Sequence, residues 1–374
     1  MKDIIEYVKE TGKSTLEEVP FGEVDSLVLS QFSYLKFDGI VPGISQVKAI
    51  SVEDIAQHEL VEKLFSDERY AKDNRALFQA MVESERFRHM KLNFYVNMVD
   101  TAWEMQFSAV TCLFPNGLIY VAYRGTDESL IGWKEDFNMG FLTPVPAQEK
   151  AVQYLNRVSE YFAGGFMVGG HSKGGNLAVY SAMKCKPSVS DRIVKIYSHD
   201  GPGFREEILQ SGEYEKISDR VCKLLPHSSI VGMLLQQQEK YEVVECRSVG
   251  LFQHNPYNWI VEDSKFKQVK EIDAGTRILD DGLNKWAASL DKEQLQEIVE
   301  ALYQVINATE ATTLLELTRD WKKSAAAMTT AIKDMDQETK KMIKLVVKAL
   351  FKQLNETVKE ELPTPKKIKL KESV

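Results

Sequence analysis

The chain has 374 residues, 44% hydrophobic and 27% charged, a composition typical of a globular protein with a sizeable core and attached regions. A net charge of −8, from 47 basic and 55 acidic residues, argues against a general nucleic-acid-binding protein. The four cysteines are scattered without a CxxC pair, so we expect isolated buried thiols in a reducing compartment.

The first residues of the chain carry charges where a signal peptide needs an apolar run, and no later segment has the uncharged length of a membrane span. We therefore expect a cytoplasmic protein without a transmembrane segment. Histidines and carboxylates do not cluster at the spacing of metal ligands, so we expect neither a metal nor a cofactor.

Residues 1–90 read as a mainly helical segment that packs on the core. Within it, residues 24–35 place apolar side chains at helical spacing. Ser51 is positioned to cap a short helix, with Asp54 at the capping-box position. The side chains predicted to face the core are Leu27, Leu29, Phe32 and Leu35.

The pattern changes to strands at about residue 91. Residues 92–99, 105–114 and 118–123 are rich in aromatic and β-branched side chains, with a turn signal at 115–117. They predict an antiparallel meander that feeds the edge of a larger sheet. A helical run over 147–162 then leads toward the next strand.

The sequence is organised around residues 165–179. A short apolar run at 166–168 predicts a buried strand, and a helix-like stretch follows from Leu177. Between them, residues 170–174 fit Gly-x-Ser-x-Gly, the nucleophile elbow of α/β-hydrolases, which projects a serine from a sharp strand-to-helix turn. A phosphate-binding loop is disfavoured because the Gly-Lys-[Ser/Thr] ending is missing. Ser172 is therefore the predicted nucleophile.

Strands at 192–198, 220–225 and 241–246 continue the alternation with helices. This alternation around a serine elbow predicts an α/β fold, a mostly parallel α/β-hydrolase (lipase-like) sheet with helices on both faces, over residues 91–265.

Residues 266–374 are expected to form a C-terminal helical region. Capping-box patterns begin at Asp291 and Asp334, an apolar stripe runs from Ile343 to Val358, and a basic tail ends the chain. An amphipathic helix docked on the same chain, with a solvated tail, is the favoured interpretation. A peripheral contact of the basic tail with an anionic membrane or a partner stays open.

A serine nucleophile needs a general base, and the base needs an acid to orient it; in α/β-hydrolases these follow the serine in the order acid, then histidine. His199, His227 and His254 lie downstream of Ser172. His254 is the predicted base because it lies in a loop after the last strand, where this fold presents its histidine. His171 is adjacent to the nucleophile and is expected to be structural.

Two sets of segments carry a resemblance to known families. Residues 124–126 with Trp133 and Asp136, together with 170–178, resemble class 3 (fungal-type) lipases. The segments 199–204, 229–234 and 253–254 resemble more closely the Mbeg-like family of bacterial α/β-hydrolase proteins, and the likeness covers roughly residues 20 to 265.

The resemblance implies an oxyanion hole made by the backbone N–H groups of Thr126 and Lys173, in agreement with the usual pairing of one amide after the nucleophile and one from an earlier loop. It also implies that Arg124 and Asp136 anchor the Thr126 loop. Lipases usually carry leucine at the position of Lys173. The added cation either favours an anionic substrate group or points to solvent.

The acid departs from the lipase pattern. Lipases carry an aspartate after the strand at 221–225, but this chain has Ser228 and Ser229 there without a carboxylate. Asp200, one strand earlier, is the best substitute as the triad acid. The alternative is a turn aspartate that caps the bend at 201–202.

The predicted function is a serine hydrolase, lipase- or esterase-like, that cleaves a small acyl-ester or lipid substrate through an acyl-enzyme on Ser172. The alternative is a hydrolase-like scaffold, slow or inactive in catalysis, that binds an acylated ligand or a protein partner. The candidate site comprises Ser172, His254 and Asp200 with Thr126 and Lys173, and no nucleic-acid partner is expected.

Overall fold

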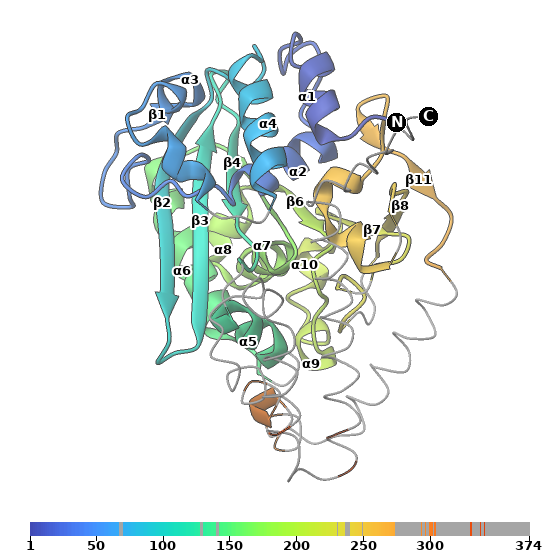
Figure 1. Ribbon diagram of the computed structural model, residues 1–374. Coiled ribbons are helices and arrows are strands. Elements are labelled where there is room, and N and C mark those ends of the chain that lie inside the picture. The colour runs from blue at the N-terminus through green and yellow to red at the C-terminus, as the bar shows by residue number, and fades with distance from the viewer. Residues whose placement is uncertain are drawn as a thin grey trace, which may run out of the picture. The chain divides into compact units, whose positions relative to one another are not determined.

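The protein is described here by a computed structural model (Figure 1) covering residues 1–66, 70–127, 130–139, 142–229, 231–235, 240–248 and 250–273, with isolated positions between 293 and 340. The chain forms two compact units, Met1–Gln296 and Glu297–Val374, and the fold given below is that of the first. The predicted C-terminal capping boxes, apolar stripe and basic tail lie outside the described residues, apart from those isolated positions. In the part of the chain that is described, no helix is both long and apolar enough to span a bilayer.

The first unit is built on a mixed sheet of nine described strands in the order β1-β2-β3-β4-β5-β6-β7-β8-β11 (Figure 1). Strands β4 to β8 are parallel neighbours, whereas β1 to β4 form an antiparallel meander and β11 pairs antiparallel with β8. The bounds are β1 Ile50–Ser51, β2 Lys91–Asp100, β3 Met105–Leu113, β4 Ile119–Tyr123, β5 Phe166–His171, β6 Ile193–His199, β7 Val221–Pro226, β8 Glu242–Val244 and β11 Gln268–Val269.

The remaining elements are helices and one small hairpin. They are α1 Ile4–Thr11, α2 Glu23–Phe32, α3 Val52–Ala56, η1 Val61–Phe65, α4 Ala71–Val82, α5 Leu130–Asn138, α6 Pro146–Val158, η2 Ser159–Tyr161, α7 Lys173–Lys184, α8 Pro187–Ser190, α9 Glu206–Leu209, α10 Glu215–Ser218, η3 Gly250–His254, η4 Pro256–Asn258, β9 Val261–Glu262 and β10 Lys265–Phe266. The expected α/β-hydrolase fold is confirmed by the parallel strands around the elbow and by the helices that cover them.

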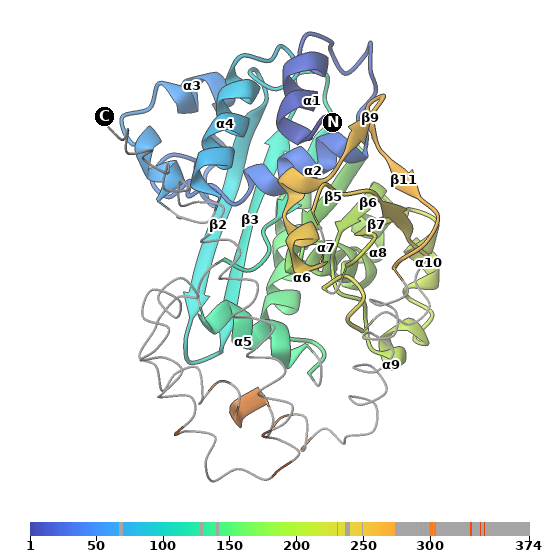
Figure 2. The ribbon, with the colours of Figure 1, turned by 45° about the vertical axis from the view of Figure 1, so that its right-hand side comes forward.

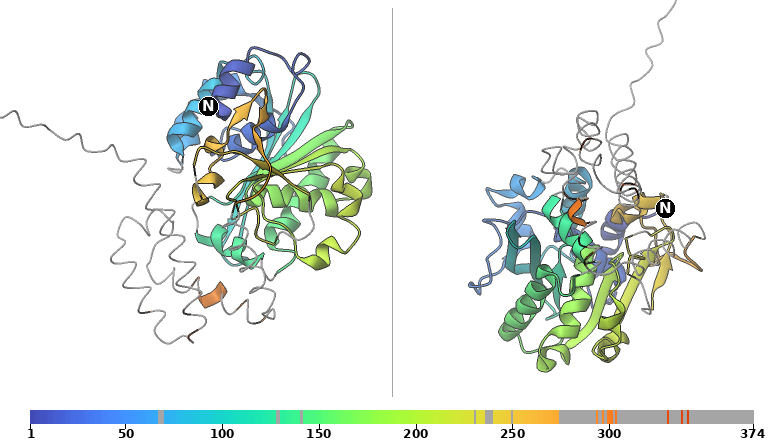
Figure 3. Two further views of the ribbon diagram at one scale, coloured as in Figure 1. Left: turned by 90° about the vertical axis from the view of Figure 1, so that its right-hand side faces the viewer. Right: turned by 90° about the horizontal axis from the view of Figure 1, so that it is seen from below.

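Side chains alternate between the two faces of the sheet along each strand, and helices cover both faces, so both are buried. On β4, Tyr120 and Ala122 belong to a core shared with the N-terminal helices, while Val121 and Tyr123 belong to a second core with α6 and α7. In the left view of Figure 3 the blue N-terminal helices and the green helices lie on opposite sides of the sheet. The prediction of helices on both faces is therefore confirmed.

Helix α2 lies directly against the parallel strands β4, β5 and β6. The four predicted core positions are all buried, three of them on α2 and Leu35 just after it. Four polar residues of α2, namely Asp25, Ser26, Ser30 and Gln31, are buried too. Asp25 forms a two-pronged ion pair with Arg86, with both N–O distances at 2.7 Å. Ser51 caps α3 by accepting from the backbone N–H of Asp54, as predicted.

The end of the hydrolase core returns to the N-terminal helices, as Figure 2 shows for α2 and β9. The backbone N–H of Phe266 donates to Glu23 of α2 at 2.8 Å, and Val261 bridges to Lys2. Four strands were not predicted: β1, β9, β10 and β11. The last three follow His254, so His254 does not come after the last strand, and β11 lies at the start of residues 266–374, which were predicted to be helical. Each of the four is two residues long, too short for a period-two pattern to be recognised.

Candidate active site

The nucleophile elbow forms at the turn from β5 into α7. Ser172 has φ +59° and ψ −134°, a conformation that L-residues rarely adopt and that persists only where the surroundings enforce it. A Cβ at Gly174 would collide with the backbone carbonyl of Tyr123 on β4, so the helix reaches the sheet only with glycine there. The N–H of Ser172 donates to the carbonyl of His199 at 2.9 Å, which ties the elbow to the neighbouring strand.

The predicted base and acid are in contact. His254, at the end of η3, places Nδ1 2.6 Å from Oδ2 of Asp200, which follows β6. Nε2 of His171 donates to the carbonyl oxygen of His254 at 2.9 Å. His171 therefore supports the backbone of the base candidate, in keeping with the structural role expected for it.

Asp200 is held by the loop that lacks the usual acid. Its Oδ1 accepts from the hydroxyl of Ser229 and from the N–H of Gly232, the latter at 3.1 Å. With His254 on Oδ2, the described partners of this carboxylate are the histidine and the loop after β7, not the bend at 201–202. This geometry disfavours the turn-cap alternative. The sequence showed only that Ser229 stands where lipases carry a carboxylate, and its role as a donor to Asp200 was not predicted.

The two other downstream histidines face elsewhere. His199 is fully buried against α2, with Nε2 2.8 Å from the hydroxyl of Ser26, and burial lowers its pKa to about 3, so it is neutral. Nε2 of His227 lies 2.8 Å from the side-chain amide of Gln253. Of these three histidines, His254 is the one whose ring contacts a carboxylate in the described part of the chain.

The loop that carries Thr126 is pressed against the elbow. A Cβ at Gly125 would stand 2.6 Å from the carbonyl of His171 and 3.1 Å from Cβ of Ser172, so only glycine allows this approach. Thr126 donates from Oγ1 to Oδ2 of Asp136 at 2.6 Å. The anchoring role expected for Asp136 fits this bond.

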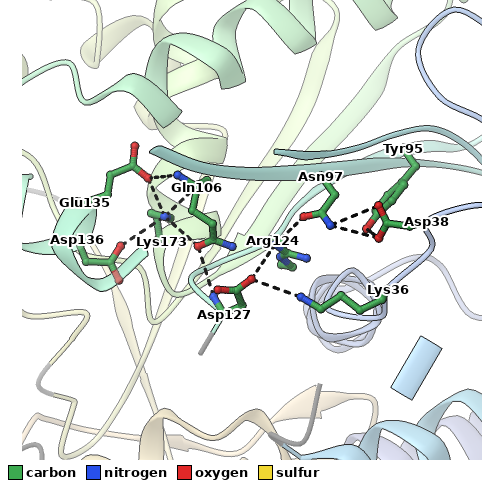
Figure 4. A network of polar contacts seen from close by, with 10 residues as sticks. All are labelled: Lys36, Asp38, Tyr95, Asn97, Gln106, Arg124, Asp127, Glu135, Asp136 and Lys173. Carbon is green, nitrogen blue, oxygen red and sulfur yellow. Dashed lines mark hydrogen bonds and ion pairs between the residues drawn. The ribbon is translucent and has the colours of Figure 1, made fainter. Parts of the chain in front are cut away.

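Arg124 fixes the other side of the same loop (Figure 4). Its guanidinium is buried and donates to Oδ1 of Asn97 at 3.0 Å and to Oδ2 of Asp127 at 3.3 Å. Lys36, from the N-terminal segment, reaches the same Asp127 oxygen at 3.4 Å. Arg124 therefore contacts the loop and the sheet, as expected, and it is not exposed to a substrate.

Both sequence-based interpretations of the Lys173 side chain were wrong. The side chain is only 1% exposed, and Nζ lies 2.9 Å from Oε2 of Glu135 and 3.1 Å from the carbonyl of Gln106 (Figure 4). Burial works to lower the pKa of Lys173, but Glu135 and Asp136 raise it above its ordinary value. The ammonium is therefore charged, yet it faces neither substrate nor solvent.

Ser172 and His254 are 9% and 8% exposed, so both lie just beneath the surface. The hydrogen bonds found among the described residues do not include one from Oγ of Ser172 to His254. Within the same residues, no three His, Cys, Asp or Glu side chains are arranged to hold a metal ion.

Comparison with known proteins agrees with the resemblance read from the sequence motifs. No curated protein matches the chain. Among solved structures, the crystal structure of M37 lipase matches at 17% identity with a TM-score of 0.37, covering 57% of this chain and 70% of that one. Residues 81–304, more than half of the chain, match the Mbeg1-like family. The chain thus belongs to the Mbeg1-like family.

Proposed function

We propose that this protein is a serine hydrolase that cleaves acyl esters through an acyl-enzyme on Ser172. The observation that carries the proposal is the 2.6 Å contact between His254 and Asp200, formed beside a strained Gly-x-Ser-x-Gly elbow. A histidine oriented by a buried carboxylate is the arrangement that activates a serine for acyl transfer.

In the proposed reaction, Nε2 of His254 takes the proton of the Ser172 hydroxyl while Oγ forms a bond to the acyl carbon. The carbonyl π electrons move onto oxygen, and the resulting oxyanion accepts from the N–H groups of Thr126 and Lys173. The intermediate then collapses, the ester C–O bond breaks, and the imidazolium gives its proton to the leaving alcohol. In the second half of the reaction, His254 takes a proton from water while the water oxygen forms a bond to the acyl carbon. The bond from the acyl carbon to Oγ of Ser172 then breaks, Oγ takes the proton from His254, and the carboxylic acid is released.

Asp200 would hold His254 with the proton on Nδ1, which leaves Nε2 free to accept, and would stabilise the imidazolium that forms. Its own orientation is supported by Ser229 and Gly232. The acid thus comes from the loop after β6, while the loop after β7 supplies its donors.

A second candidate function is a hydrolase-like scaffold that binds an acylated ligand or a protein partner with slow or lost catalysis. The observation that favours it is the open Ser172–His254 pair, since no hydrogen bond joins the two among the described residues. In ligand-free enzymes such contacts are often long and tighten only when substrate binds, so the hydrolase remains the better-supported proposal.

The test is labelling with a fluorophosphonate, alongside hydrolysis of p-nitrophenyl esters of increasing chain length. We expect labelling of the wild type, none of Ser172→Ala, and losses of about 10³-fold or more in kcat for His254→Ala and Asp200→Asn. His89→Ala is the matched control, because His89 also contacts a carboxylate, Glu53 at 2.9 Å, but lies exposed.

If His89→Ala keeps wild-type activity, the losses in His254→Ala and Asp200→Asn are due to the candidate active site and not to the loss of any His–carboxylate contact. A folded wild type that is neither labelled nor active on any ester chain length would favour the scaffold function instead.

A further inference from the structure

A buried ion pair joins the residue after the nucleophile to three other elements. Glu135 of α5 is fully buried; its Oε2 accepts from Lys173 Nζ at 2.9 Å and from the N–H of Gln106 on β3 at 3.0 Å. Its Oε1 accepts from the N–H of Ala147, in the first turn of α6, at 2.8 Å. The pair therefore ties α7 to β3, α5 and α6 at the end of the sheet that carries the elbow (Figure 4).

The next residue of α5 connects this junction to the Thr126 loop. Oδ1 of Asp136 lies 3.7 Å from Nζ of Lys173, and Oδ2 accepts from Oγ1 of Thr126 at 2.6 Å. Thr126 and Lys173 are the residues whose backbone N–H groups are the proposed oxyanion donors. The side chains of Thr126 and Lys173, from two segments far apart in the sequence, thus both contact the carboxylate of Asp136.

Stability alone is a weak reason to bury this lysine. Desolvation of two charges offsets much of their attraction, and well-packed apolar replacements of buried ion pairs are often neutral or stabilising. What the ion pair adds is geometry, because Lys173 Nζ donates to Oε2 of Glu135 and to both oxygens of Gln106, which uses its three N–H groups. A buried ammonium with all its donors used holds one arrangement of the elements that it joins.

We propose that Lys173 is a positioning residue, whose buried ammonium holds the elbow and the Thr126 loop at the separation that lets both backbone N–H groups reach one oxyanion. The inference rests on the proposed hydrolase function and names the residue that holds the two donors of its oxyanion hole in place. A displacement of one donor by about 1 Å is enough to cost roughly 10²-fold in rate, so the effect is measurable.

The experiment compares Lys173→Met with the double variant Lys173→Met/Glu135→Gln. The single variant leaves Glu135 buried without its cation and is expected to unfold more readily, whereas the double variant removes both charges. Lys184→Met is the control, since Lys184 lies on the same helix and its ion pair with Glu213 is partly exposed. Circular dichroism checks folding, and fluorophosphonate titration counts reactive Ser172 in each preparation.

We expect the folded double variant to label to the same final fraction as the wild type, but to lose about 30- to 300-fold in kcat per labelled site with KM changed less than about threefold. The inhibition constant for a trifluoromethyl ketone, which mimics the oxyanion, should rise by the same factor as kcat/KM falls. A loss of stability alone would reduce the labelled fraction and leave these values unchanged.

Wild-type kcat and inhibition constant in the folded double variant would overturn the inference while leaving the proposed function intact. Failure of both variants to fold would assign Lys173 to stability alone and would overturn it as well. A wild type that neither labels nor hydrolyses esters would overturn the proposed function first, and the inference with it.

Discussion

At the scale of single residues, the proposed acid depends on donors from the loop after the neighbouring strand β7. Asp200 contacts His254 with one oxygen and uses the other to accept from Ser229 and Gly232. A carboxylate that is fixed on both oxygens keeps the imidazole in one orientation, which is the condition for an effective general base.

Ser229→Ala removes one of the two donors to Oδ1 of Asp200 and should lower kcat/KM for ester hydrolysis about tenfold, since a hydrogen bond to a charged group contributes about 1.5–3 kcal/mol. Ser228→Ala is the control, because the Ser228 hydroxyl contacts Asp273 instead. Equal rates for the two variants would contradict a role of Ser229 in holding the acid.

His199 should make the protein sensitive to acid. Burial lowers its pKa to about 3, so the folded protein leaves it neutral while the unfolded chain protonates it below its ordinary value of 6.5. The unfolded state therefore binds more protons, and stability is lost as the pH falls from 6.5 toward 3, by up to about 1.4 kcal/mol per pH unit.

The measurement is urea unfolding at pH 7.5 and 5.5 for the wild type and His199→Gln, which retains a polar group facing Ser26 but does not titrate. Between these pH values the wild type should lose about 1 kcal/mol more than the variant. Parallel losses would show that His199 is protonated in the folded protein.

At the scale of elements, the elbow depends on the closeness of α7 to β4. Gly174→Ala should abolish Ser172 labelling and lower the free energy of unfolding by at least about 2 kcal/mol, because the added methyl meets the immovable carbonyl of Tyr123. Gly164→Ala, where nothing lies within 4 Å of the new carbon, should leave both unchanged. The measurement is chemical denaturation of both variants, with fluorophosphonate labelling of Ser172 in parallel; equal behaviour of the two variants would contradict the prediction.

The elements and residues that the sequence predicted correctly are those with local signals. The elbow has a five-residue motif, and the meander has alternating strands with a turn between them. The partners of Lys173 could not be predicted, because Glu135 is 38 positions away and looks like an ordinary acidic residue of a helix. The role of Ser229 was not predicted for the same reason: its partner Asp200 follows a different strand, β6, so no local spacing connects them.

At the scale of the whole molecule, the N-terminal segment is part of the hydrolase core, since α2 covers the face of the sheet opposite to α7. Its link to the rest includes the fully buried pair of Asp25 with Arg86, to which Tyr7 adds a hydrogen bond at 3.0 Å. A buried charge that loses its partner is strongly destabilising.

Arg86→Met should therefore lower the free energy of unfolding by about 3–5 kcal/mol, because Asp25 stays buried without its cation. Arg75→Met is the control: Arg75 makes a similar two-pronged pair with Glu62, but both side chains are exposed, and the loss should stay below about 1 kcal/mol. If urea denaturation gives similar losses in the free energy of unfolding for both variants, burial does not determine how much these ion pairs contribute to stability.

The contact of α2 with β10 also has a consequence for synthesis of the chain. Helix α2 ends at Phe32, but its neighbour Phe266 is added only after most of the hydrolase core. A ribosome that adds roughly 5–20 residues per second needs on the order of ten to fifty seconds between these two points. During that time α2, whose apolar side chains are buried in the complete fold, lacks part of its final cover. We therefore expect a chaperone to act on this segment of the nascent chain.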